Sequence, residues 1–252
     1  MNEELELEQL EEEERSITES AIALMLLVLL DINEGITNDL RLFYQKYGKD
    51  GKVTLNEARK WVSNKDRRRR INKLFADVQG HFDKNSSTLR KYFRVFGEEV
   101  LVKESDYFGV EVPEEAMTPK WGQDDLTWSD RLDDDIDIWV AQILVAIKLA
   151  FVKKEDIETI VKTIDKKFDS IAKATKRLAL TESTAITSSA RRAIYKQLGI
   201  KEYDYYAKLD ERTCDNCGGL HGLRFPMSMY EIGVTAPPIH GHCRCFTKPV
   251  RD

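Results

Sequence analysis

The residues most able to do chemistry are the cysteines and histidines near the C-terminal end of this 252-residue chain. All four cysteines and three of the four histidines follow residue 212. Cys214 and Cys217 form a Cys-x2-Cys pair. His240 and Cys243 form a His-x2-Cys pair, and 22 residues (218–239) separate the two pairs. Two such pairs are typical of a tetrahedral zinc site, so the spacing predicts a structural zinc ion.

The second pair leaves its cysteine ligand open. Cys245 lies two residues beyond Cys243 and would point the same way from an extended backbone, so we regard Cys245 as a substitute ligand. His242 adjoins Cys243 and is the least convenient ligand, so we expect it to face solvent or to hydrogen-bond a ligand. The alternative is that the four cysteines form disulfides or stay free thiols. As disulfides they could pair in three ways. Zinc is favoured, since the N-terminus lacks the pattern of a secretory signal and the rest of the chain has no cysteine.

The sequence holds no established catalytic pattern. A catalytic zinc ion needs an open coordination position and a nearby acid or base. Neither the His-x-Glu of zinc deaminases nor the His-Glu-x2-His of zincins occurs. His221 is the best candidate to activate water in a nuclease, but a turn histidine that bonds the backbone is the favoured interpretation. We therefore expect no catalytic residue, no cofactor besides structural zinc, and no small-molecule substrate.

The same C-terminal residues resemble the phage head morphogenesis family, the phage Mu F-like and SPP1-type minor head proteins. The shared pattern comprises Asp210, Thr213-Cys214-x2-Cys217, Leu220-His221-Gly222, Phe225 and Pro237-Pro238-x-His240-x2-Cys243-Arg244. The family pattern has proline after the histidine, where this chain has Gly241. Thr181-Glu182 and Trp128-x2-Arg131 also resemble family segments, although neither is specific alone. The resemblance spans about Trp121 to Pro249.

The resemblance implies a structural virion protein that acts in head morphogenesis and in DNA packaging or ejection. Its partners would be the portal protein and other capsid or scaffold proteins, with possible contact with packaged DNA. Its place would be the capsid interior or portal vertex, and the host cytoplasm during assembly. We expect Tyr203, Tyr205 and Tyr206 to be available for protein contacts.

Two other functions stay open. One is a metal-dependent nuclease or phosphodiesterase that acts on phage DNA. The other is a toxin-associated module, since domains of this family also occur fused to toxins. Only seven residues follow Cys245, which leaves no room here for a fused toxin and favours a head protein.

Composition indicates an ordinary globular chain without a general affinity for nucleic acid. Apolar residues make up 42% and charged residues 33%, and the net charge is -5. The longest apolar run, Ala21 to Leu30, has ten residues, about half of what a membrane span needs. Before it, Glu3 to Glu14 holds eight glutamates. This acidic segment is either a disordered tail or a helix completed by a partner chain. Four consecutive arginines, 67–70, are expected on a solvated helix, with DNA contact as the alternative.

Hydrophobic periodicity predicts a mainly α fold, a helical body with a small C-terminal α+β zinc-knuckle-like module. Helices are expected at 16–30, with Thr18 as N-cap, and at 39–47. A further helix carries Trp61 and begins at a Thr54–Glu57 capping box. Helices are also expected at 86–100 and 181–198, and two packed helices at 136–151 and 157–171. Alternation from Tyr203 to Leu209 predicts a strand, with shorter strands near Phe225 and Phe246. The expected regions are an acidic tail (1–15), an N-terminal helical region (16–112), a helical family core (113–200) and the metal module (201–252).

Overall fold

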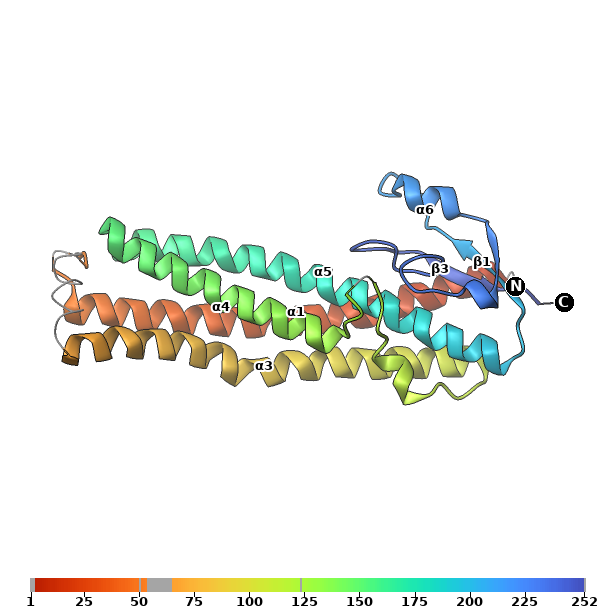
Figure 1. The fold of residues 1–252 in the computed structure, drawn as a ribbon, viewed down its shortest axis with the longest axis horizontal. Helices are drawn as coiled ribbons and strands as arrows, with labels where there is room; N and C mark the ends of the chain where they lie inside the picture. Colours follow the sequence, from red (N-terminus) through yellow and green to blue (C-terminus); the bar gives the residue numbers. More distant parts are fainter. Residues whose placement is uncertain (1–2, 50, 54–64, 123, 252) are drawn as a thin grey trace. The chain divides into compact units, whose positions relative to one another are not determined.

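Long helices make up most of the computed structural model, which describes residues 3–49, 51–53, 65–122 and 124–251 (Figure 1). The long helices are α1 (Glu3–Tyr47), α3 (Lys65–Phe108), α4 (Trp128–Lys153) and α5 (Ile157–Gln197). The short elements are helix α6 (Asp215–Leu220), the 3-10 helices η1 (Glu114–Met117) and η2 (Met227–Met229), and the strands β1 (Glu202–Tyr206), β2 (Arg224–Pro226) and β3 (Phe246–Pro249). The predicted mainly α fold with a small C-terminal α+β module is confirmed.

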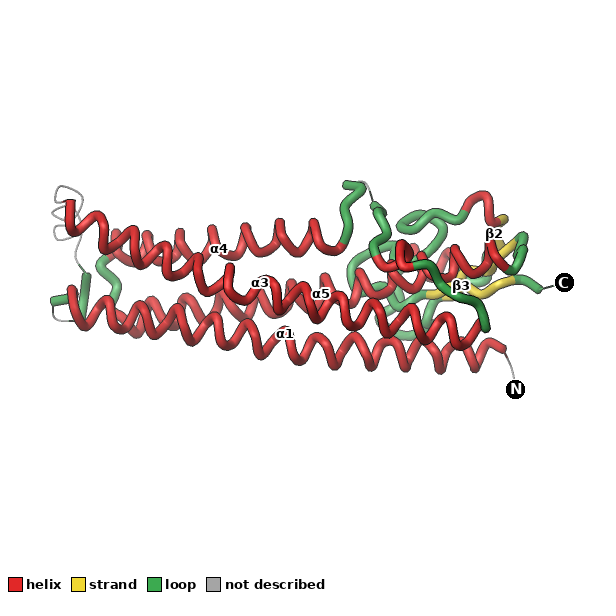
Figure 2. The backbone as a smooth tube through the Cα atoms, turned by 90° about the horizontal axis from the view of Figure 1, so that it is seen from below, coloured by secondary structure: helices red, strands yellow, loops and turns green. Residues whose placement is uncertain are grey.

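The three strands form one antiparallel sheet in the order β2-β1-β3. The strands are yellow in Figure 2. In the register of this sheet, Tyr203 lies opposite both Phe225 and Pro249. The alternation predicted for β1 is present, because Tyr203 and Tyr205 point inward and are fully buried. Our expectation that these two tyrosines are available for partners is therefore wrong. Tyr203 instead packs against Tyr195 of α5 and Tyr230.

Helix α1 begins much earlier than expected and includes the acidic segment. Thr18 is not its N-cap, because the helix runs on either side of it and its hydroxyl bonds Glu14 O (3.0 Å) and Ser183 (2.7 Å). The helix extends because Leu7 and Leu10 continue its apolar face and are buried in a cluster with Phe246 of β3. The acidic segment is therefore not a disordered tail, and its Leu7 and Leu10 are covered within this chain, whereas Leu5 is exposed.

Helix α5 is likewise longer than predicted and runs through Thr181 and Glu182 without a break. No glycine or proline interrupts 157–197, so nothing in that stretch would end the helix. Gly199 does end it as expected, with φ +68°, and Ile200 N–H closes the terminus by donating to Tyr195 O (2.9 Å). Thr181 and Glu182 are therefore mid-helix residues and not a helix start.

The chain forms two compact units, and each long helix contributes to both. Unit 1 comprises 1–23, 91–132 and 175–252, and unit 2 comprises 24–90 and 133–174. The division of the chain into the four regions that we expect from the sequence stays a prediction. The Thr54–Glu57 capping box and Trp61 lie outside the described residues.

Helix α1 also has the length and composition of a membrane-crossing helix over part of its course. An 18-residue window within Leu5–Tyr47 has a mean hydropathy of 1.7, and 39% of that window is buried inside the fold. Buried core helices have the same properties, and Met25, Leu29 and Ile32 of α1 are buried in this way. The match is therefore weak evidence for a membrane span.

A buried ion-pair cluster holds the elements of unit 1 together. Arg191 of α5 is fully buried, and its Nε and Nη2 donate to Glu104 of α3 at 2.6 to 3.1 Å. Its Nη1 lies 2.8 Å from Glu11 of α1 and donates to Thr247 O of β3 at 3.2 Å. One guanidinium thus contacts three other elements, and because it is buried it depends on all of them for compensation.

The same cluster contains more carboxylates than one arginine can neutralise. Glu14 is buried beside Glu104, and its Oε2 accepts from the Thr187 hydroxyl at 2.9 Å. Burial, followed by the charges of Glu104 and Glu11, raises the pKa of Glu14 well above its usual value. Burial also raises the pKa of Glu11 to about 7, against the opposing charge of Arg191. The folded state therefore binds protons at these carboxyls more tightly than the unfolded chain does.

Stability should fall as pH rises from about 4.5 to about 7, which is the range between the ordinary pKa of Glu11 and its raised value. The contribution of Glu11 is complete below its unfolded pKa and is lost as pH rises through its folded pKa, while the loss from Glu14 continues to higher pH. We expect the free energy of unfolding to drop by about 1 to 3 kcal/mol across this range. Denaturant titrations at several pH values measure it.

Glu14→Gln should raise stability at pH 8 and flatten the pH dependence, because the amide keeps an acceptor for Thr187 and carries no charge. Glu8→Gln is the matched control, since Glu8 lies on the same helix and is exposed. An unchanged slope in Glu14→Gln would show that Glu14 stays ionised in the folded state.

Candidate metal centre

The first predicted ligand pair, Cys214 and Cys217, lies at the start of helix α6. Cys214 is the N-cap of α6, and its Sγ accepts a hydrogen bond from Cys217 N–H at 3.4 Å. Upstream of it, the Thr213 hydroxyl donates to Lys208 O (2.6 Å) and accepts from Asp210 N–H (2.8 Å). A capped one-turn start places two thiols on the same side of the chain, as a metal knuckle needs.

The second ligand pair lies on the tight turn after residue 238. Cys243 N–H donates to His240 O at 3.2 Å, which closes the turn. The Nδ1 of His240 lies 2.8 Å from Gly241 O, so Nδ1 donates this hydrogen bond and Nε2 is the nitrogen that can bind a metal ion. Nε2 points toward Cys217 Sγ, 3.2 Å away. Gly241 stands where the family pattern has proline. The Arg177 side chain lies close to it: an added Cβ would be only 3.3 Å from Arg177 Cδ, so Arg177 would have to shift to admit a larger residue.

The structure brings all five predicted and substitute ligands into one cluster. Two overlapping triads, Cys214–Cys217–His240 and Cys217–Cys243–Cys245, each have ligand atoms within 4.8 Å of one another. Cys217 belongs to both triads, and its Sγ lies 3.9 Å from that of Cys243. The cluster could therefore bind a metal ion. The choice between Cys243 and Cys245 as a ligand stays a prediction.

On its buried side the cluster is covered by Tyr205, and its thiols hydrogen-bond to one another. The Tyr205 hydroxyl donates to Cys217 Sγ at 3.6 Å, and burial raises the pKa of that tyrosine. Burial raises the pKa of Cys217 to about 11. A hydrogen bond with Cys245 lowers the pKa of Cys243 to about 5. Cys243 is therefore the thiol that most readily becomes a thiolate, the form that binds metals.

Helix α5 anchors the second knuckle through two threonines. The Thr184 hydroxyl lies 3.1 Å from Cys243 O, to which it donates. Thr181 Oγ1 accepts from the backbone N–H of His242 at 3.1 Å. At the far side of the module, Arg244 forms two 2.6 Å bonds with Asp210, which lower the pKa of that carboxyl. The threonine of the Thr-Glu segment thus holds the metal knuckle against the helices.

The other histidines do not join the metal cluster. The Nδ1 of His221 accepts from Ala207 N–H at 3.1 Å, and its ring meets Tyr206 edge to face. His81 lies in unit 2 and bonds Asp39 at 2.9 Å. The interpretation of His221 as a turn histidine bound to backbone agrees with this geometry.

Glu182 forms a buried ion pair with a residue outside its own helix. Glu182 is buried, and it accepts from Trp121 Nε1 at 3.0 Å and from Arg131 Nη1 at 3.2 Å. The Arg131 guanidinium also lies 4.6 Å from the Trp121 ring centroid and pairs with Asp124. Burial raises the pKa of Glu182. The sequence marks Arg131 and Glu182 as separate features. It does not predict their ion pair, because no local spacing rule connects residues that are 51 positions apart.

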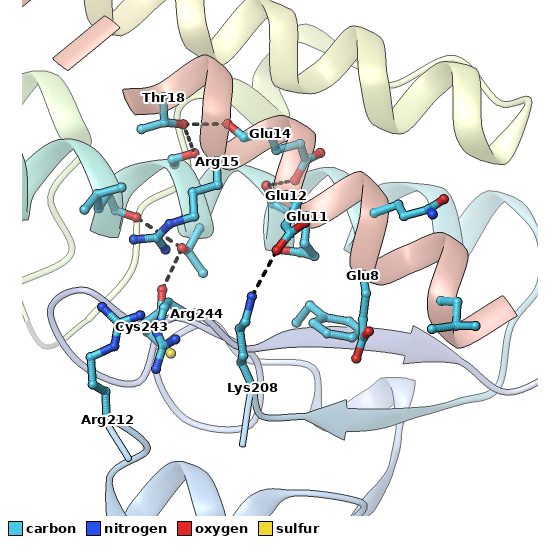
Figure 3. A pocket seen from close by; sticks show the side chains of 17 residues that line it. Glu8, Glu11, Glu12, Glu14, Arg15, Thr18, Lys208, Arg212, Cys243 and Arg244 are labelled. Atoms are coloured by element: carbon cyan, nitrogen blue, oxygen red, sulfur yellow. Dashed lines mark hydrogen bonds and ion pairs between the residues drawn. The ribbon is translucent and has the colours of Figure 1, made fainter. Parts of the chain in front are cut away.

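A cavity of about 270 Å³ adjoins the cluster, between the start of α1, α5 and the C-terminal module (Figure 3). Its α1 side carries Glu11, Glu12 and Glu14, and its module side carries Lys208 and Cys243. Lys208 donates to Glu12 across the cavity at 3.3 Å. Because opposite charges line the two sides and already pair, the cavity has no clear preference for an anion or a cation.

Comparison with known proteins gives one result for this chain. Residues 141–248 match the family model described as Phage Mu protein F like protein. The matched range begins within α4 and ends within β3, so it includes all of α5 and every residue of the metal cluster. No curated protein and no solved structure matches the chain.

Arg131→Leu should destabilise unit 1 by about 3 to 5 kcal/mol, because it leaves the Glu182 carboxylate buried without its cation. The double variant Arg131→Leu, Glu182→Leu should recover part of that loss, since no buried charge remains unpaired. Chemical denaturation measures both.

Arg90→Leu is the control, because the Arg90–Asp133 pair is exposed and should contribute less than about 1 kcal/mol. Equal losses in the Arg90 and Arg131 variants would contradict a structural role for the buried pair.

Proposed function

Because residues 141–248 match the family model described as Phage Mu protein F like protein, we propose that this chain is a phage head morphogenesis protein and, more specifically, a minor head protein. Its function is structural: it associates with the capsid at or near the portal vertex and assists head assembly and the packaging or delivery of DNA. The observation that carries the proposal is the family match, which covers the helix that anchors the knuckle and the whole cysteine–histidine cluster.

We further propose that the cluster binds one structural zinc ion through Cys214, Cys217, His240 and Cys243. In a tetrahedral site with zinc–sulfur bonds near 2.3 Å, two sulfurs lie about 3.8 Å apart, and a sulfur and a nitrogen lie about 3.5 Å apart. The Cys217–Cys243 separation is 3.9 Å and the Cys217–His240 separation is 3.2 Å. The donor types suit zinc, and these two separations at Cys217 support the proposal. The four proposed ligands are divided between two triads that share Cys217, so binding one ion would draw the outer ligands closer together.

Zinc in this site would complete the fold of the module. Among the described residues, all four cysteines are free thiols, and three of them are buried. The described sheet of this module has three short strands of three to five residues. A small sheet of this kind gains stability from a metal ion, because the binding free energy adds to the folding free energy.

The geometry favours a structural role over the alternative of a nuclease or phosphodiesterase. Three thiols and one imidazole fill a tetrahedral shell and leave no position for water. His221, the best candidate to activate water, uses Nδ1 to accept from backbone Ala207. The partners of this protein are accordingly the portal protein and other capsid or scaffold proteins, and contact with packaged DNA is secondary.

Purified protein should contain about one zinc ion per chain, and Cys214→Ser or His240→Ala should lower that content at least about tenfold, since each removes a ligand. Elemental analysis measures the metal, and near-ultraviolet circular dichroism follows the tyrosines of the module. His242→Asn is the control, because His242 has a positive φ of 61° that asparagine tolerates and it is not a proposed ligand. A metal-free wild-type protein with oxidised thiols would overturn the zinc site.

The head-protein proposal is tested in phage particles. Mass spectrometry of purified heads should detect the chain, and heads assembled with the Cys214→Ser variant should contain less of it, because the unfolded module loses its contacts. A nuclease assay with magnesium, manganese or zinc should give no cleavage of DNA. Heads that never contain the chain, together with metal-dependent cleavage that Cys214→Ser abolishes, would favour the enzyme instead.

A further inference from the structure

Helix α4 has an apolar stripe that the described part of the chain leaves exposed. Ile138, Val145 and Val152 follow one another at intervals of seven residues, and Leu149 lies between the last two. These four side chains are 49% to 52% exposed, and all belong to unit 2. A seven-residue interval keeps side chains on one side of a helix, which is the pattern of a helix that packs along another helix.

This stripe is separate from the face that α4 buries in its own unit. Ile136, Ile143 and Ile147 are at most 6% exposed and form the inner face. A solvent-facing helix normally has polar residues opposite its buried face. A second apolar face on α4, which the described residues leave uncovered, therefore suits a contact with a further helix.

A groove that could accept a second helix lies beside the stripe. The groove has a volume of about 380 Å³ and lies between α4 and α5 of unit 2. Ala141, Val145 and Leu149 line its α4 side, and Thr163 and Lys167 line its α5 side. The small side chain of Ala141, between Ile138 and Val145, allows a second backbone to approach closely.

The charges along the exposed face identify the helix that fits. Asp134 and Asp137 are exposed before the stripe, and Lys148 and Lys153 are exposed along its second half. A face that is acidic at one end and basic at the other complements itself when it is turned end over end. A parallel copy would instead place like charges together.

We propose that α4 of a second copy of this chain packs antiparallel along this stripe, about a twofold axis near residue 143. In this register Asp134 of each copy faces Lys153 of the other, Ile138 faces Leu149, and Gln142 faces Val145. Each helix then covers the apolar stripe of the other, and the two ends of the contact carry opposite charges. The proposal concerns unit 2 alone and does not depend on the metal cluster or on the head function.

Sedimentation equilibrium of the purified full chain should show a dimer that dissociates on dilution. Asp134→Lys or Lys153→Asp should each raise the dissociation constant about tenfold or more, because each creates two like-charge contacts per dimer. The double variant Asp134→Lys, Lys153→Asp should return to within about threefold of the wild type, because the opposite charges face each other again. A mixture of the two single variants should form heterodimers by the same pairing.

Val145→Lys should abolish the dimer, since it places a charge at the centre of the stripe. Val102→Lys is the matched control: Val102 of α3 is 58% exposed, against 51% for Val145, and should leave the dimer intact. Far-ultraviolet circular dichroism confirms that the variants keep their helices. A wild-type chain that stays monomeric at all concentrations, or a double charge variant as weak as the single ones, would overturn the proposal.

Discussion

The burial of Arg191 is the constraint on which the rest of unit 1 depends. A guanidinium removed from water has to find its compensation inside the protein. Arg191 finds it on three elements, through Glu104 of α3, Glu11 of α1 and the Thr247 carbonyl of β3. Because Arg191 itself belongs to α5, its position couples the three helices and the C-terminal sheet. If any of these elements detached from the cluster, the buried charge of Arg191 would lose part of its compensation.

Helix α5 connects this charged cluster to the metal knuckle. Along its length it presents Thr181 and Thr184 to the His240–Cys243 turn, Glu182 to Arg131 and Trp121, and Arg191 to the carboxylates. A change at the metal cluster would therefore act on a helix that is already fixed by two buried ion pairs. This arrangement explains how a sheet of three short strands can be held against a helical body in one register.

The elements that could be predicted were those whose signal is local. The alternation at Tyr203 and Tyr205 and the stop at Gly199 each depend on a few neighbouring residues. The short spacings within the pairs Cys214–Cys217 and His240–Cys243 indicated a cluster, which the structure contains, while their role as metal ligands stays a proposal. The extent of α1 and the roles of Glu11, Glu14 and Glu182 could not be predicted, because they depend on partners far along the chain. Buried glutamates look like solvated ones in a sequence until the arginine that pairs with them is placed.

The packing of Leu7 and Leu10 against Phe246 has a consequence for how the protein is made. The first turns of α1 find their apolar partner in β3, far along the chain, so this contact can form only after β3 has been synthesised. Contacts between such distant residues also slow folding, because a long loop must close first. Until then, the glutamates that surround these leucines keep the segment in water and separate nascent chains by charge repulsion. The acidic start of α1 thus protects an unfinished chain as well as serving the finished one.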